Sequence, residues 1–242
     1  MVVSKKEKMA AGESPTDSKE QLPLLVLVAG VTSGAGKTSL AEALVNILAR
    51  RNSTAAAKIT VTHGERGCPH GGKGCDVCGS LGGQFQLITR QSIISQPGTD
   101  TARLALAGAS PVLWTIAREQ FIADAWREMQ SKLLGVKFVV VESNTLAAVT
   151  TPALTLMIVD PTVSRRLWKP SAERLIATSD CLIFNDRGPE DKRHALLKEI
   201  EGLRGATEDL IFVDHPHEIE KHGVFMQHLD RACMGMTAPT AF

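Results

Sequence analysis

Residues 30–38 combine glycines with a Lys-Thr pair, the residue types that a loop needs to bind phosphate. The order is Gly30, five residues and then Gly36, Lys37 and Thr38. Glycines let the backbone curve so that its N–H groups converge on phosphate oxygens, and a following helix adds partial positive charge. We expect nucleotide contacts from the whole loop, namely from Gly30, Thr32, Ser33, Gly34, Ala35, Gly36, Lys37, Thr38 and Ser39.

Two side chains of this loop have distinct expected roles. Lys37 would reach the β- and γ-phosphates as a catalytic residue, and the Thr38 hydroxyl would bind Mg²⁺. The loop is one residue longer than the usual Gly, four residues and Gly-Lys-Thr, which would begin at Val31. The alternative is a glycine-rich turn that binds nothing, but a Lys-Thr pair directly after the last glycine argues against it.

This longer loop resembles that of dethiobiotin synthetase and of the cobyrinic acid diamide synthases. These enzymes belong to a class of P-loop proteins, often called SIMIBI, that includes the MinD-like ATPases and the metal-insertion GTPases. The lysine that the MinD branch carries early in the loop is not found here, and Thr32 is the residue nearest to its place.

A second group of chemically active residues lies in the glycine-rich segment 63–83, which contains Cys68, His70, Cys75 and Cys78. Three thiolates and an imidazole suit a tetrahedral Zn²⁺ ion, with Ni²⁺ or, less readily, an iron–sulfur cluster as other occupants. The spacing of Cys75 and Cys78 lets two sulfurs reach one ion. The alternatives are a redox pair of these two cysteines and a zinc knot with a purely structural role.

The Cys-Pro-His sequence at residues 68–70 also resembles the metal motif of the urease accessory GTPase, which hands on nickel. The motif follows the second expected strand, roughly where that family carries it. Cys75 and Cys78 depart from the family pattern, which leaves the identity of the metal open.

Glu142 is the candidate acidic residue of the site. It follows the continuous apolar run 136–141, which predicts a strand buried on both faces of a parallel sheet. In P-loop proteins, an acidic residue at such a strand end organises Mg²⁺ or the attacking water, so we expect Glu142 to be catalytic and to bind Mg²⁺ together with Thr38. The alternative is a carboxylate that faces only water.

The segment 140–152 resembles the corresponding part of the urease accessory and hydrogenase nickel-insertion GTPases, which have a Glu-Ser-Gly-type turn. Here Ser143 is followed by Asn144 instead of glycine. We therefore expect a turn that is less free to move.

Asn185 is the candidate base-binding residue. It follows the expected strand 180–184 and begins the sequence Asn-Asp-Arg-Gly, where a GTPase of this class would carry Asn-Lys-x-Asp. Only the Asn matches, so guanine specificity has no support and the choice between ATP and GTP stays open. The resemblance to dethiobiotin synthetase, which uses ATP, implies that Asn185 contacts the base.

Alternating apolar runs and amphipathic segments predict an α/β fold, a mostly parallel P-loop NTPase sheet with helices on both faces and an inserted Cys/His metal loop. After the apolar run that begins at Leu24, the expected strands are 55–61, 85–89, 111–116, 136–141, 154–159, 180–184 and 210–213. The expected helices are 39–51, 99–109, 117–134, 190–203 and 218–232. Because parallel strands end at one edge, the loops that carry the candidate residues should meet there. In the helix after residue 99, we expect Asp100 and Arg103 to form a local ion pair, with a substrate or switch contact as the alternative.

The composition indicates an ordinary protein of the cytoplasm. The chain has 242 residues, 43% of them hydrophobic, and a formal net charge of +1, which gives no reason to expect a nucleic-acid partner. Three of its five cysteines lie within eleven residues, unlike a secreted disulfide framework, and no stretch is apolar enough to cross a membrane. We expect a disordered tail (1–22), a nucleotide-binding domain (23–235) and a flexible end (236–242).

These observations predict a Mg²⁺-dependent NTPase that couples ATP or GTP to the handling or insertion of a metal or a metal-containing cofactor. Its partners would be a client metalloenzyme or cofactor-assembly protein and a second copy of the chain. One alternative is an ATP-dependent synthetase like dethiobiotin synthetase, with a structural zinc loop. The other is a nucleotide-binding regulator without enzymatic activity.

Overall fold

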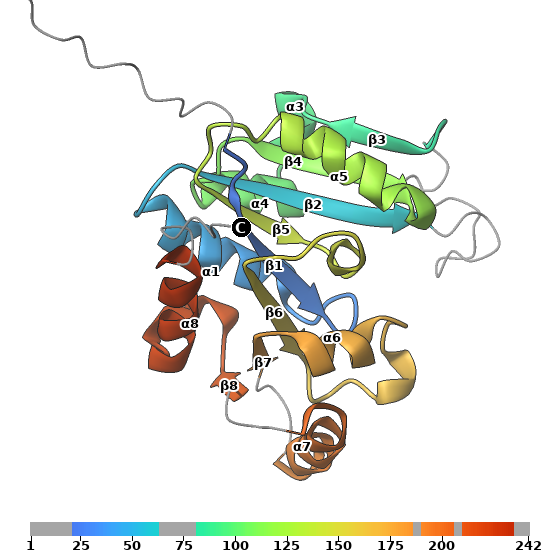
Figure 1. The fold of residues 1–242 in the computed structure, drawn as a ribbon. Helices are drawn as coiled ribbons and strands as arrows, with labels where there is room; N and C mark the ends of the chain where they lie inside the picture. The colour runs from blue at the N-terminus through green and yellow to red at the C-terminus, as the bar shows by residue number, and fades with distance from the viewer. Residues whose placement is uncertain (1–20, 63–80, 186–189, 206–209, 235–242) are drawn as a thin grey trace, which may run out of the picture.

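One eight-stranded sheet runs through the molecule (Figure 1). The computed structural model describes residues 21–62, 81–185, 190–205 and 210–234. The strand order is β3-β4-β2-β5-β1-β6-β7-β8, and every described pair is parallel except β3 with β4. The strands are β1 (Leu24–Gly30), β2 (Thr54–Thr62), β3 (Phe85–Ile88), β4 (Val112–Arg118), β5 (Phe138–Glu142), β6 (Leu154–Val159), β7 (Cys181–Asn185) and β8 (Leu210–Val213). The predicted α/β fold with a mostly parallel sheet is confirmed.

Helices cover both faces of this sheet, as predicted. On one face lie α1 (Lys37–Ala49), α4 (Asp100–Leu106) and α8 (Gly223–Met234). On the other lie α5 (Ile122–Ser131) and α6 (Ala172–Thr178), against which α7 (Glu190–Arg204) packs. Right-handed crossovers require this division, because the chain moves toward β3 through α1 but toward β8 through α5 and α6.

The central strand β1 shows why its sequence is apolar throughout. Val26 and Val28 pack in the same cluster as Leu44 of α1, whereas Leu25 and Leu27 pack in the cluster that contains Trp126 of α5. Successive side chains of a strand point to opposite faces, so a strand with helices on both sides needs apolar residues at every position.

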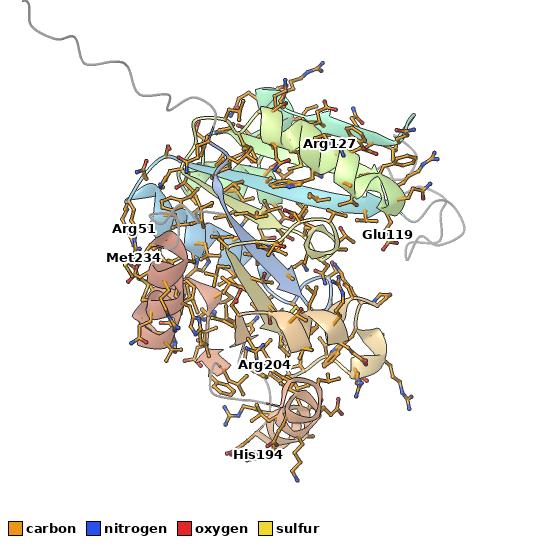
Figure 2. All side chains as sticks on the ribbon, in the orientation of Figure 1. Arg51, Glu119, Arg127, His194, Arg204 and Met234 are labelled. Carbon is orange, nitrogen blue, oxygen red and sulfur yellow. The ribbon has the colours of Figure 1, made fainter. Side chains whose placement is uncertain are left out.

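Arginine side chains attach the C-terminal helices to their neighbours. Figure 2 labels two of them, Arg51 and Arg204. Arg51, just after α1, donates from Nη1 to Asp230 Oδ1 of α8 at 2.6 Å. Arg204, at the end of α7, donates to the carbonyl oxygens of Ile176 and Ser179 at the end of α6.

The expected helix 117–134 is wrong in its first part. Strand β4 continues to Arg118 because its partner β2 continues to Thr62, and a 3-10 turn (Glu119–Phe121) separates it from α5. Pairing between strands has overridden the local helical pattern. The expected helix 218–232 is likewise divided into a 3-10 helix (Pro216–Lys221) and α8. The short helices α3 (Gln91–Ile94) and α6 were not predicted.

Several predictions fall on parts of the chain that the structure leaves out. Cys68, His70, Cys75 and Cys78 lie outside the described residues, as do nearly all of the two predicted tails. Among the residues that are described, no helix has both the length and the apolar character needed to cross a bilayer.

Candidate nucleotide-binding site

The candidate residues meet at the edge of the sheet where the parallel strands end. Strand β1 ends at Gly30, β5 at Glu142 and β7 at Asn185. Two side-chain contacts join these ends to residues 30–38, called the phosphate loop below. Thr38 Oγ1 donates to Glu142 Oε2 at 2.8 Å, and Asn185 Nδ2 donates to the Ala35 carbonyl oxygen at 3.3 Å. The convergence predicted from strand polarity is therefore confirmed for the phosphate loop, Glu142 and Asn185.

The loop backbone has the form of an anion cradle. Gly34 and Gly36 have φ values of 80° and 106°, in the left-handed region that side chains disfavour. A Cβ on Gly30 would lie 2.7 Å from Lys37 Cγ, so only glycine lets the chain and the lysine approach so closely. Helix α1 begins at Lys37 with no side-chain cap among the described residues and no acid in its first turn, which leaves its first N–H groups for an anion.

Lys37 is buried beneath this loop. Its side chain folds back so that Nζ donates to the Thr32 carbonyl oxygen at 2.7 Å. Burial, together with the nearby charge of Lys169, lowers the pKa of Lys37 to about 8. The Thr32 hydroxyl is also buried and has no hydrogen-bond partner in the described part of the chain, whereas Ser33 and Gly34 are exposed. A phosphate group bound by this loop would offer acceptor oxygens to the Lys37 ammonium group.

The carboxylate of Glu142 fits the expected Mg²⁺ site. The residue is only 5% exposed, and Thr38 approaches one carboxylate oxygen while Lys58 Nζ of β2 lies 3.3 Å from the other. Lys58 also pairs with Asp100 at the start of α4. Two carboxylates and a hydroxyl are the oxygen ligands that Mg²⁺ prefers, so these residues fit the ion.

Lys58 is a functional candidate that was not predicted from the sequence, and its partner Asp100 was considered only for a local ion pair or a substrate contact. Burial alone would lower the pKa of Lys58, but the carboxylates of Glu142 and Asp100 together raise it above its ordinary value. Burial alone would raise the pKa of Asp100, but the Lys58 ammonium group, together with the Thr38 hydroxyl and the Arg103 guanidinium, lowers it. Lys58 is the single charged residue in strand β2, and this was the signal in the sequence that could have drawn attention to it.

The predicted ion pair between Asp100 and Arg103 is wrong. Asp100 instead pairs with Lys58, and Arg103 pairs with Glu42 of α1 at 2.6 Å while donating to the Ser39 hydroxyl at 3.0 Å. Helix α4 packs on α1 and beside β2. This packing brings Asp100 close to Lys58 of β2 and Arg103 close to Glu42 of α1, so neither side chain pairs with the other. Asp100 thus shares Lys58 with Glu142 at the candidate site, and the substrate or switch contact stays a prediction.

Lys169 adds a further positive charge that no local sequence signal indicated. Its backbone N–H donates to the Val31 carbonyl oxygen at 2.8 Å, which fixes the segment before α6 against the phosphate loop. Burial lowers the pKa of its side chain, although the charge of Glu142 opposes that shift. The edge therefore gathers three lysines, Lys37, Lys58 and Lys169, a charge pattern suited to an anionic ligand.

At the other end of the loop, Asn185 lies beside Gly36 and the chain that follows β8. It is 1% exposed, and its Oδ1 atom has no hydrogen-bond partner among the described residues. A Cβ on Gly36 would lie 3.2 Å from Asn185 Nδ2 and 3.4 Å from Pro216 Cγ. Pro216 was not predicted as part of the site. The rest of the segment that departs from the guanine motif, residues 186–188, lies outside the described residues.

Within the described residues, no group of three or more His, Cys, Asp or Glu side chains is arranged to hold a metal ion. The predicted Cys/His site lies in a part of the chain that this observation does not include.

A comparison with protein-family models finds no match, and a comparison with curated proteins finds none either. Solved structures with a similar fold include a LAO/AO transport system kinase, with 16% identity and a TM-score of 0.49 over 91% of this chain and 63% of the kinase. The cell division protein MinD of Aquifex aeolicus has 14% identity and a TM-score of 0.40 over 90% of this chain and 99% of MinD. A ParA family ATPase of Chlorobium tepidum TLS has 11% identity and a TM-score of 0.40 over 91% and 93%. The resemblance to nickel-insertion GTPases and dethiobiotin synthetase stays a prediction from sequence motifs.

Proposed function

We propose that this protein binds a nucleoside triphosphate with Mg²⁺ and hydrolyses it slowly. The observation that carries the proposal is the hydrogen bond from Thr38 to the buried carboxylate of Glu142, made at the uncapped start of α1. It joins the end of a glycine-rich loop to an acidic strand end, the pairing that P-loop enzymes use for a phosphate-bound cation. Thr38 and Glu142, with Asp100, would hold Mg²⁺, which supplies positive charge to the phosphate oxygens.

The residues of the chain divide the remaining work between them. Lys37 would leave the Thr32 carbonyl and bind phosphate oxygens, whose negative charge favours its protonated form. Glu142, fixed by Thr38 and Lys58, would orient the attacking water. Burial of these groups strengthens each charge interaction relative to bulk water.

We propose ATP as the preferred nucleotide. The Ala35 carbonyl can only accept a hydrogen bond, so the amide nitrogen of Asn185 must face it and leave Oδ1 as a buried acceptor. The exocyclic amino group of adenine is a donor, whereas guanine carries a carbonyl oxygen at the equivalent position. If the group at position 6 of the purine faces Oδ1, adenine would satisfy this acceptor and guanine would not.

Phosphate release from ATP and GTP by the full chain tests the enzymatic proposal. We expect Mg²⁺-dependent release that stops when the metal is chelated, and a loss of roughly tenfold or more in Thr38→Ala, as for a charge-assisted contact. Thr178→Ala is the matched control, because Thr178 is exposed at the end of α6 and its hydroxyl bonds only the Arg174 carbonyl among the described residues. Release that is equal in wild type and Thr38→Ala would refute the assignment.

We further propose that the Cys/His segment binds a transition metal, Zn²⁺ or Ni²⁺, that the protein delivers to a client metalloenzyme or cofactor-assembly protein while acting as a homodimer. The support is the sequence, which places four ligand residues of the right types between Cys68 and Cys78. The segment also begins after Thr62, where β2 ends at the same edge as the phosphate loop. If nucleotide binding changes metal affinity, metal must change nucleotide affinity by the same factor.

Metal analysis of protein purified without chelator, with and without a non-hydrolysable triphosphate, tests this delivery role. If the segment carries metal for delivery, the Cys75→Ser variant should lose its metal but stay folded and still bind nucleotide. A structural zinc knot should instead unfold in that variant, because its metal-binding energy is folding energy. Phosphorylation of a small carboxylate would favour the alternative of an ATP-dependent synthetase. Nucleotide binding without hydrolysis would favour the alternative of a regulator without enzymatic activity.

A further inference from the structure

Strand β1 extends beyond its neighbour β5, and this leaves a polar gap beside the phosphate loop. The register between the two strands ends where Val28 faces Glu142, but β1 continues to Gly30. The Val28 carbonyl oxygen accepts from the Ser143 N–H at 3.0 Å, whereas the Val31 N–H donates toward β6, to Ile158. Because alternate residues of a strand direct their polar groups to the same side, the N–H and C=O of Gly30 face the gap.

Asn144 fills this gap with its side-chain amide. Its Oδ1 accepts from the Gly30 N–H at 3.2 Å, and its Nδ2 donates to the Gly30 carbonyl oxygen at 2.9 Å. Nδ2 also lies 3.3 Å from Ser171 Oγ, just before α6. The amide thus takes the place of a strand partner for a buried peptide, whose polar groups would otherwise be unsatisfied. A glycine at this position could not do so.

The rest of the turn after β5 is held from within. Ser143 Oγ accepts from the backbone N–H groups of Thr145 and Leu146, each at 3.2 Å. Asn144 is 7% exposed and Ser143 4%. The turn that carries Glu142 is therefore fixed to the first residue of the phosphate loop by two hydrogen bonds, and to its own next residues by two more.

We propose that Asn144 is a positioning residue that locks the start of the phosphate loop to the Glu142 turn. Thr38 and Glu142 then face each other before any ligand arrives, and the turn keeps one conformation whether a diphosphate or a triphosphate is bound. The part of this inference that concerns nucleotide rests on the proposed function. The locking of the two segments does not, and it can be measured without ligand.

The first measurement is hydrogen exchange in the nucleotide-free full chain. In Asn144→Ala, amides of residues 28–31 and 142–149 should exchange roughly tenfold faster, the factor expected for the loss of a net hydrogen bond. Thr145→Ala is the matched control, because Thr145 lies in the same turn and its hydroxyl contacts only Ser143 among the described residues. Equal exchange in both segments of wild type and Asn144→Ala would overturn the proposal.

The second measurement separates positioning from mere stability. The Mg²⁺ concentration that half-saturates binding of a non-hydrolysable ATP analogue should rise roughly tenfold in Asn144→Ala, while affinity measured in chelator stays within about twofold. A purely structural residue would lower the melting temperature and leave the Mg²⁺ requirement unchanged, and that outcome would refute the positioning role.

The third measurement uses wild type alone and so does not depend on the variant folding. Exchange over residues 142–149 should be the same with ADP and with the ATP analogue, both with Mg²⁺. A triphosphate-specific change there would refute the fixed turn. If wild type binds no nucleotide, the proposed function fails, whereas the nucleotide-free comparison still decides whether Asn144 locks the two segments.

Discussion

The two ends of the candidate site differ in how far the chain has already satisfied its own polar groups. At the phosphate end, Lys37 is bonded to Thr32, and Thr38 and Lys58 both contact Glu142. At the base end, Asn185 has one bond to the loop, and its Oδ1 has no partner in the described part of the chain. The phosphate end is assembled before a ligand binds, and the base end has an acceptor still to be satisfied.

This difference indicates where affinity and where selectivity should arise. Thr38, Lys58 and Glu142 already lie together, so only Lys37 has to leave its contact with Thr32 when phosphate binds. Little free energy is then spent on ordering the site, and phosphate contacts should supply most of the affinity. A single buried acceptor adds less, but it discriminates between purines because the wrong one leaves it unsatisfied. Substitutions at the phosphate end should therefore have larger effects than those at the base end.

The largest effect should follow Lys37→Ala. Removing the ammonium group deletes a charge-assisted contact to phosphate, and we expect a loss of triphosphate affinity on the order of a hundredfold by calorimetry. Lys132→Ala is the matched control, because Lys132 is exposed at the end of α5. Nearly equal triphosphate affinities for Lys37→Ala and Lys132→Ala would contradict the claim that the phosphate end supplies most of the affinity.

Glu142→Gln should have the next largest effect, and only when Mg²⁺ is present. The amide keeps the shape of the side chain but removes its charge, so the gain in triphosphate affinity from Mg²⁺ should fall by about tenfold or more. Titrations with Mg²⁺ and with chelator measure this gain. Glu128→Gln on the exposed side of α5 should retain it, and an unchanged gain in Glu142→Gln would place the cation elsewhere.

Lys58→Met tests whether a lysine holds the two carboxylates of the phosphate end in the absence of metal. Without the ammonium group, Asp100 and Glu142 lose their shared partner, and the melting temperature of nucleotide-free protein should fall by several degrees, about 2–4 °C per kcal/mol for a chain of this size. Added Mg²⁺ should restore part of that loss in the variant and change wild type little. A variant that melts like wild type in chelator would show that Lys58 has no such role.

The smallest effect should follow Asn185→Ala at the base end. We expect ATP affinity to fall by about tenfold or less, the range of one neutral hydrogen bond, and the preference for ATP over GTP to disappear. Competition binding with both nucleotides measures the preference. A wild type that strongly prefers GTP would show that another residue selects the base.

The parts of the site that the sequence predicted depend on short-range patterns. Lys37 and Thr38 follow from the spacing of one loop, and Glu142 follows from the apolar strand before it. Their convergence follows from the common polarity of parallel strands. The fold class was predictable for the same reason, because each buried strand and each amphipathic helix carries its own periodicity.

The parts that were missed depend on contacts between segments distant in sequence. Asp100 pairs with Lys58 and not with its neighbour Arg103, because the packing of α4 against β2 brings Asp100 close to Lys58. Asn144 was noticed only as a departure from glycine, and its bonds to Gly30 required knowledge that β1 extends beyond β5. Local spacing contains no information about either arrangement.

Calorimetric titration of the wild-type chain with a non-hydrolysable ATP analogue, with and without Mg²⁺, tests the central claim most directly. The phosphate end described here predicts one bound nucleotide per chain, and Mg²⁺ should tighten binding roughly tenfold or more because Thr38 and Glu142 already face each other. Absence of binding, or an affinity that does not depend on Mg²⁺, would contradict the account.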